Sequence, residues 1–144
     1  HGQIRRQRQM CIRDSDNGRL RNAFPVAIGM PGWETPTGLF EVLQKIANPV
    51  WVHPVSGDRV EEQGVNNPLG SHWIAFHRDC RGRDAHDGDA WITIKGCTTT
   101  GFHGTPHRWT VGRAVSHGCV RLYNEDVRAL YRQVSLGTQV TVLP

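Results

Sequence analysis

The chain has 144 residues, of which 38% are hydrophobic, and it carries a formal net charge of +4. This length fits one domain with a core of its own. Sixteen glycines and the modest hydrophobic content favour a mainly β fold over a helical bundle. No apolar run approaches the ~20 residues of a membrane helix, so no membrane span is expected, and no signal peptide is visible. Because a natural chain does not start at His1, we expect a fragment or a mature form.

The positive charge suits a polyanionic surface such as a cell wall, a membrane face or nucleic acid. No alternation of aromatic and basic residues and no finger-like spacing supports nucleic acid, which is therefore not an expected partner. The four cysteines contain no CxxC pair, which argues against structural zinc. The acidic run at 84–89 lacks the spacing of a calcium loop and is interpreted as an ordinary loop. No metal or cofactor is expected.

The first half of the chain predicts strands. Residues 1–15 are interrupted by arginines and are interpreted as an edge strand, or a basic arm, or non-native sequence, ahead of a domain at 16–144. Asp16-Asn17-Gly18 predicts a hairpin, because Asn-Gly readily adopts the positive φ values of a type I′ turn. Strands are expected at 20–28, where apolar residues alternate, and at 39–43, 73–76 and 91–94, with an edge strand at 51–55.

One amphipathic helix is expected near the C-terminus. Asn124 is its predicted N-cap, and two acidic residues follow at the positive end of the helix dipole. Gly137 is the predicted end of the helix, and residues 140–142 predict a last strand. The apolar face of the helix follows the spacing i, i+3, i+4, i+7 through Val127, Leu130, Tyr131 and Val134.

Two short stretches carry residues suited to covalent chemistry. Cys119 follows His117 and Gly118 in the string Ser116-His117-Gly118-Cys119-Val120-Arg121, and a second histidine lies in His103-Gly104-Thr105. A thiol needs a base to become a strong nucleophile, and an imidazole or a nearby cation can lower its pKa. Taken alone, Cys119 would be a small buried hydrophobic residue, but its neighbours favour a nucleophile. The other five histidines are interpreted as ordinary surface or core residues: His53, His72, His77, His86 and His107.

These stretches resemble the signature of the L,D-transpeptidase catalytic domain (YkuD-type) of bacterial cell-wall enzymes. That family has His-Gly-Thr, then a short variable segment, then Ser-His-Gly-Cys-hydrophobic-Arg. The resemblance covers roughly residues 20–143, with further landmarks at 25–29, 35–40, 67–70, 124–126 and 137–138. It implies a mainly β, sandwich-like fold of mixed sheets with one helix near the C-terminus, and a cysteine at the mouth of a cleft.

The resemblance also implies roles for individual residues. Cys119 would attack the third residue of a peptidoglycan tetrapeptide stem, release D-alanine and form a thioester. His103 would be the base, oriented by the carbonyl of Gly104. His117 and the amides near Gly118 would stabilise the oxyanion, with Ser116 hydrogen-bonding nearby. The residues predicted to bind the substrate are Arg121, Thr105 and Phe102.

The segment at 79–100 is longer than the family pattern needs and is interpreted as an insertion beside the cleft. It holds Cys80 and Cys97. Because the resemblance places the enzyme in the periplasm or outside the cell, where disulfides persist, we predict that these two cysteines are paired. A monomer acting on peptidoglycan stems is expected.

Several alternatives remain open. The acceptor of the acyl group can be a second stem, giving a 3→3 cross-link, or a lipoprotein lysine, a free D-amino acid or water; water would make the enzyme an L,D-carboxypeptidase. A papain-like peptidase is disfavoured because His103 precedes Cys119. A wall-binding module without activity is disfavoured because the residues that the chemistry needs are present. Activity is expected to fall on the acid side as the histidine–cysteine pair is protonated.

Overall fold

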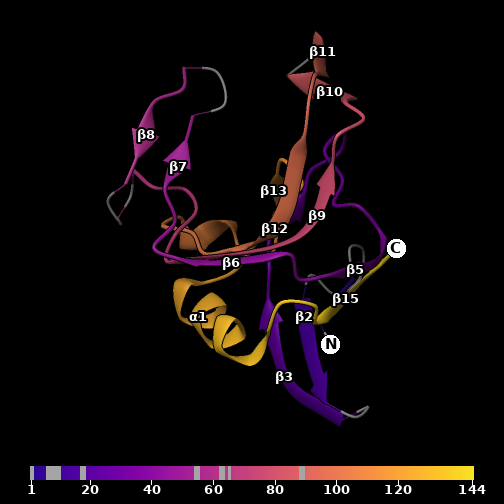
Figure 1. Cartoon of the computed structure of the whole chain (residues 1–144), viewed down its shortest axis with the longest axis vertical. Coiled ribbons are helices and arrows are strands. Elements are labelled where there is room, and N and C mark those ends of the chain that lie inside the picture. The colour runs from indigo at the N-terminus through magenta and orange to yellow at the C-terminus, as the bar shows by residue number, and fades with distance from the viewer. Residues whose placement is uncertain are drawn as a thin grey trace.

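Strand pairing organises the chain into two main sheets in the computed structural model, which describes residues 2–5, 11–16, 19–53, 56–61, 64, 66–87 and 90–144 (Figure 1). The expected mainly β architecture with mixed sheets and one helix near the C-terminus is confirmed. The first sheet has the order β3 (Arg19–Pro25), β2 (Cys11–Asp16), β1 (Gly2–Arg5), β15 (Gln139–Leu143) and β5 (Gly38–Glu41). Only the β1–β15 pair in it is parallel among the described strands.

The N-terminal residues take part in this sheet. β1 pairs with both β2 and β15, and β2 pairs with β1 and β3, so neither is an edge strand, contrary to the edge-strand interpretation. The hairpin expected at Asp16 is formed by β2 and β3, in which Asp16 lies opposite Arg19. The turn residues 17 and 18 and the side chain of Cys11 lie outside the described residues. The division of the chain at residue 15 stays a prediction.

The second sheet carries His103 and Arg121 of the predicted site. Its order is β14 (Val120–Arg121), β12 (Thr98–His103), β9 (His72–Asp79) and β6 (Gln44–Ala47). β14 runs parallel to β12, and the other pairs are antiparallel. Three smaller two-stranded units complete the fold: β4 (Ile28–Gly29) with β13 (Ala114–Ser116), β7 (Trp51–Val52) with β8 (Arg59–Val60), and β10 (Arg83–Asp87) with β11 (Ala90–Ile94).

The two faces of the second sheet have different surroundings, because alternate residues of a strand point to opposite faces. Phe102, Ile74 and Val120 lie opposite one another on adjacent strands and are buried in the core. The next row consists of His103, Trp73 and Arg121. This second row therefore lies on the other face.

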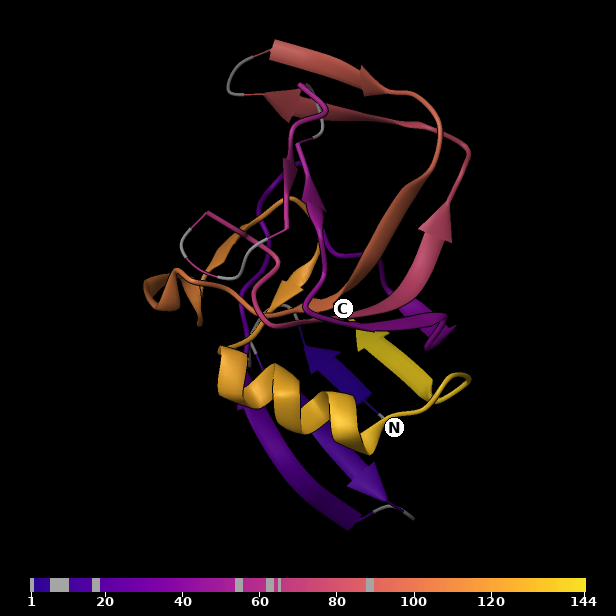
Figure 2. The same ribbon diagram turned by 60° about the vertical axis from the view of Figure 1, so that its left-hand side comes forward.

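The helix α1 (Asn124–Gln133) packs on the core face of the second sheet. Its buried residues Val127 and Leu130 belong to the core, and Lys45 of β6 donates a hydrogen bond to the carbonyl of Val134 at the end of the helix (2.8 Å). In Figures 1 and 2 the β7–β8 and β10–β11 hairpins project from the sheet on the side away from α1. The β10–β11 hairpin continues β9 and β12 beyond the end of the sheet, whereas α1 covers the core face.

Both predicted helix boundaries need correction. The N-cap is Tyr123 rather than Asn124, because the Asn124 side chain is used elsewhere: its Oδ1 accepts the backbone N–H of Ser71 (3.1 Å). The helix ends before Gly137, since Val134 already has extended backbone angles. Gly137 instead lies in the turn before β15, where its N–H donates to the carbonyl of Val42 (2.8 Å).

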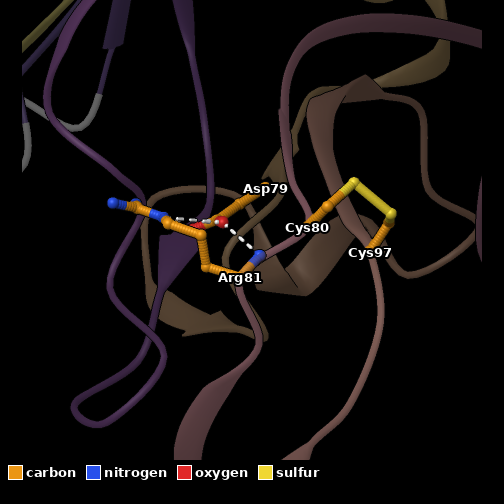
Figure 3. Close-up of polar contacts among 4 residues, drawn as sticks. All are labelled: Asp79, Cys80, Arg81 and Cys97. Carbon is orange, nitrogen blue, oxygen red and sulfur yellow. Dashed lines mark hydrogen bonds and ion pairs between the residues drawn. A yellow bond between two sulfur atoms is a disulfide. The ribbon is translucent and has the colours of Figure 1, made fainter.

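The segment at 79–100 contains one more strand than expected. Besides the predicted strand at 91–94, which is part of β11, the connection before it forms β10, so the segment is a hairpin. At its base Cys80 and Cys97 are joined by a disulfide (Figure 3). Next to it the Arg81 guanidinium donates to both carboxylate oxygens of Asp79 (3.0 and 3.1 Å), which lowers the pKa of that carboxyl to about 2. The disulfide therefore joins the two chain segments at the point where the hairpin leaves the sheet.

Candidate active site

His103 ends β12 and is buried. Its Nδ1 lies 2.5 Å from the carbonyl oxygen of Gly104. A carbonyl only accepts hydrogen bonds, so Nδ1 carries the proton and the neutral ring presents Nε2 as an acceptor. Burial lowers the pKa of His103 to about 4, the Gly104 carbonyl opposes this shift, and the charge of Arg121 adds to it. The imidazole is therefore neutral and can accept a proton near pH 7.

Glycine is required at 104 by the close approach of three chain segments. A Cβ at this position would collide with the side-chain oxygen of Asn124 and lie 3.1 Å from the backbone nitrogen of Ser71. A Cβ on Gly70 would in turn meet the backbone of Gly104, and the φ of Gly70 is +63°. The Asn124 side chain thus connects the start of α1 with the backbone of Gly70 and Ser71 and with that of Gly104.

The Ser116–Cys119 turn is held by hydrogen bonds from two directions. The Ser116 hydroxyl accepts the N–H of Gly118 (3.2 Å) and donates to the carbonyl of Cys119 (2.5 Å). The hydroxyl of Thr35 donates to the Gly118 carbonyl (2.8 Å) and accepts the N–H of Gly29 (3.1 Å). With φ at +114°, Gly118 adopts a conformation that glycine takes more readily than any other residue. These bonds fix the backbone that carries Cys119.

Cys119 has a free, partly buried thiol. Its Sγ lies 3.8 Å from the carbonyl oxygen of Thr99 on β12. Burial raises the pKa of Cys119, and the backbone amide of Gly101 and the charge of Arg121 only partly offset this. The thiol is therefore protonated at rest.

Glycine is required at 101 by the close approach of the neighbouring strand β9. The register of β12 against β9 shifts between Thr100 and Gly101, which is the irregularity of a β-bulge. A Cβ on Gly101 would lie only 2.9 Å from the Cα of Ala75 on the neighbouring strand. The backbone amide of Gly101 lies within hydrogen-bond reach of the Cys119 sulfur.

The side chains of His103 and Cys119 line a common pocket of about 330 Å³. Three other predicted residues line it as well: Ser116, His117 and Arg121. Arg121 lies directly opposite His103 in the β12–β14 pair, and burial lowers its pKa. The His117 ring packs against Trp33 with 4.5 Å between ring centroids. The structure thus gathers a thiol, a neutral imidazole and a guanidinium in one cavity.

Two residues predicted to bind substrate are placed elsewhere. Phe102 is buried in the core, where its ring packs on Phe76 (4.9 Å between centroids). Thr105 is buried too, and its hydroxyl accepts the N–H of His107 (3.0 Å). Because both side chains are almost completely buried, neither offers a surface to a ligand.

Sequence reasoning missed several residues of the site. Trp51, Pro68 and Leu69 line the pocket, and Thr35 holds the Cys119 turn. Residues 35 and 67–70 lie in stretches that carried the family resemblance, but nothing in the local pattern indicated what they touch. Trp51 gave no signal beyond belonging to a short strand. Among the described residues no group of three or more histidine, cysteine or acidic side chains could hold a metal ion.

The residues 3–142 match the family model described as the L,D-transpeptidase catalytic domain (YkuD). The chain belongs to this family. L,D-transpeptidase relatives include YqjB of Bacillus subtilis, 31% identical over 126 residues, and YcfS of Escherichia coli, 31% identical over 134 residues. The match covers 88% of this chain and 61% of YqjB, and 83% of this chain and 36% of YcfS. The chain thus spans only part of these relatives.

Solved L,D-transpeptidases share the fold. An L,D-transpeptidase from Mycobacterium tuberculosis H37Rv superposes with a TM-score of 0.69 at 22% identity, covering 99% of this chain and 57% of that one. L,D-transpeptidase 3 of the same species, solved with a faropenem-derived adduct, gives a TM-score of 0.62 at 19% identity, covering 99% and 59%. In the part of the chain described here, no helix has the length and apolar character needed to cross a membrane.

Proposed function

We propose that this L,D-transpeptidase domain acts through a thioester on Cys119, with His103 as the general base. The observation that carries the proposal is their shared pocket, in which the His103 ring is neutral and its Nδ1–H is bound to the Gly104 carbonyl. Nε2 is then the basic atom of the ring. Family membership supports peptidoglycan as the substrate.

The reaction follows from these groups. Sγ of Cys119 attacks the carbonyl carbon of the third residue of a tetrapeptide stem while its proton passes to Nε2 of His103. The imidazolium then protonates the amine of D-alanine, the C–N bond breaks, and a thioester remains. An amine of a second stem attacks the thioester, gives its proton to His103 and frees the thiol. The product is a 3→3 cross-link.

The resting pair is neutral in this scheme. The pKa of Cys119 is raised by burial and that of His103 is lowered by burial, so a thiol and an imidazole are the stable forms near pH 7. The proton therefore moves as the bond to the substrate forms, rather than beforehand. The nearby charge of Arg121 favours the developing thiolate.

One hydrogen bond of the Cys119 turn supports a choice between the possible oxyanion donors. The Gly118 N–H already donates to the Ser116 hydroxyl, so it is engaged within the turn. We propose that the N–H of Cys119 donates a hydrogen bond to the oxyanion and that His117, which lines the same pocket, also stabilises it. Ser116 then acts as a positioning residue. Arg121 is assigned to a carboxylate of the substrate, which its planar fork can bind with two hydrogen bonds.

Intact-mass spectrometry after incubation with imipenem tests the nucleophile. Relatives of this fold have been solved in complex with imipenem and with a faropenem-derived adduct. One adduct is expected on the native protein and none on Cys119→Ala, whose thermal unfolding should be little changed. His103→Gln should slow adduct formation by ~10²-fold or more, whereas His107→Gln should not. An adduct that persists in Cys119→Ala would exclude this nucleophile.

Product analysis tests the acceptor. Purified tetrapeptide muropeptides should yield a dimer joined through their third residues. A tripeptide as the main product would mean that water takes the acyl group and that the domain is an L,D-carboxypeptidase. The disulfide of Cys80 and Cys97 supports a site of action outside the cytoplasm, in the periplasm or the cell wall.

A further inference from the structure

A second, larger cavity adjoins the catalytic pocket. This groove has a volume of about 770 Å³. Its lining includes the indole side chains Trp51 and Trp73, the aliphatic side chains Ile46 and Val50, and the amide side chains Gln44 and Asn48. Trp51 and Leu69 line both cavities, so the groove continues directly into the pocket of Cys119. None of its described lining residues carries a charge.

The sheet register explains why the two cavities meet. Ile46, Trp73 and His103 lie directly opposite one another on β6, β9 and β12, so they share the face that bears the catalytic residues. The rings of Trp73 and His103 have centroids 6.1 Å apart. A ligand can therefore extend along this row from the groove to the base.

The two indole rings of the groove are half-buried, and the Trp51 ring packs edge-on against His53 with 5.4 Å between centroids. The Trp73 Nε1–H donates to Oε1 of Gln44 (3.3 Å), which leaves the ring face for apolar contact. Asn48 has a positive φ of +52°, a conformation uncommon for residues other than glycine, and such outliers concentrate at ligand sites. Val52 at the rim is 49% exposed. Exposed aliphatic and aromatic surface of this kind is typical of a binding site.

Because none of the described lining residues is charged, the groove fits an uncharged part of the substrate better than a charged part. The stem peptide carries free carboxylates and an amine, which fit the pocket of Arg121 and the histidines better than an uncharged groove. The glycan to which the stem is attached is uncharged once its lactyl group is bound to the peptide. Its sugar rings offer C–H faces for indole rings, hydroxyls for side-chain amides, and N-acetyl methyls for aliphatic residues.

We propose that the groove binds an N-acetylated amino sugar of the glycan strand that carries the donor stem. This inference rests on the proposed function, because it makes the groove a specificity site for the same reaction. The domain would then prefer stems still attached to sugar over free stems. Trp51 and Trp73 are the residues assigned to stacking on the sugar.

The test compares a disaccharide-tetrapeptide with the same tetrapeptide lacking sugars, by the kcat/KM for D-alanine release. The native protein should prefer the sugar-bearing donor by about tenfold or more, and Trp51→Ala and Trp73→Ala should reduce this ratio to about one. Taking the ratio removes any general effect of Trp73 on its neighbour His103. Trp109→Ala, in a tryptophan that is 66% exposed on the 3-10 turn Arg108–Thr110, is the control and should keep the preference.

Two further measurements separate this inference from the proposed function. Imipenem adduct formation on each variant reports Cys119 chemistry without any sugar. Titration of Cys119→Ala with both donors, followed by tryptophan fluorescence, reports sugar binding without turnover. Equal use and equal binding of the two donors by the native groove, or a preference that survives Trp51→Ala, would overturn the inference even if the adduct forms. Failure of the adduct together with preferred binding of the sugar-bearing donor would overturn only the proposed mechanism.

Discussion

Thr35 is the buried residue on which the position of the Cys119 turn depends most directly. Its hydroxyl forms hydrogen bonds with two backbone groups at once, the Gly29 N–H and the Gly118 carbonyl, and the side chain is fully buried. A buried polar group that loses its partner costs ~1–3 kcal/mol. At the scale of single residues, the hydroxyl groups of Thr35 and Ser116 therefore fix the backbone turn that carries Cys119.

Thr35→Val is expected to lower the free energy of unfolding by ~1–3 kcal/mol, because it keeps the shape of the side chain and removes its hydroxyl. It should also slow imipenem adduct formation, since the turn that carries Cys119 is no longer fixed. Denaturant titration and adduct kinetics check the two effects. Thr37→Val, at an exposed position two residues away, is the matched control, and an equal loss in both variants would contradict the assignment.

Burial of His103 predicts how activity depends on pH. The neutral ring is the proposed base, and its pKa is lowered to about 4, so activity should fall as the pH decreases through about 4 rather than around 6.5. The expected acid-side loss therefore lies lower than an unperturbed histidine would place it. A pH profile of imipenem acylation measures it. A midpoint near 6.5 would mean that solvent reaches the ring.

The same residue links stability to pH. Between pH 6.5 and about 4 the unfolded chain binds a proton at His103 and the folded chain does not, so stability decreases as the pH falls through this window. The stability lost is on the order of 3 kcal/mol, since a pKa difference of one corresponds to about 1.4 kcal/mol. Denaturant midpoints at pH 7 and 5 should differ less in His103→Gln than in His107→Gln. His72, with its pKa also lowered by burial, keeps its part of the slope in both variants.

At the scale of elements, the β10–β11 hairpin is coupled to the site through β12. The disulfide ends at Cys97, one residue before β12, and the carbonyl of Thr99 in that strand contacts the Cys119 thiol. The sequence separation of 17 residues corresponds to ~3 kcal/mol of stabilisation in the chain-entropy model. The bridge thus restrains the strand against which the nucleophile lies.

Cys80→Ser combined with Cys97→Ser should lower the free energy of unfolding by up to ~3 kcal/mol and slow adduct formation on Cys119. Alkylation of the unfolded, unreduced native protein should modify two of its four cysteines, Cys11 and Cys119. Four modified cysteines would show that the bridge is absent in solution. The single variant Cys11→Ser is the control and should leave adduct formation unchanged.

At the scale of the whole molecule, the net charge of +4 predicts attraction to an anionic wall surface. Screening shortens this attraction as the ionic strength rises, so co-sedimentation of Cys119→Ala with purified cell-wall sacculi should weaken from low to high salt. The variant excludes covalent capture from the measurement. Retention that is independent of salt would assign wall binding to the grooves instead of the overall charge.

The sequence by itself determined the chemistry of the site, because its essential parts are local. The Ser116–Cys119 string holds its own hydroxyl and a glycine with positive φ, and His103 is followed by the carbonyl that orients it. The alternating strands and the apolar helix face are local patterns too, and they fixed the fold class. The family resemblance added the roles proposed for Cys119 and His103.

Only the tertiary structure decided which distant residues complete the site. Thr35 and Gly118 are 83 residues apart, and Asn124 and Ser71 are 53 apart, yet each pair shares a hydrogen bond. The helix boundaries were mispredicted for the same reason, since Asn124 bonds to a distant loop instead of capping its own helix. The row Ile46, Trp73 and His103 depends on strand registers, which the long-range pairing of β6, β9 and β12 sets and no local pattern specifies.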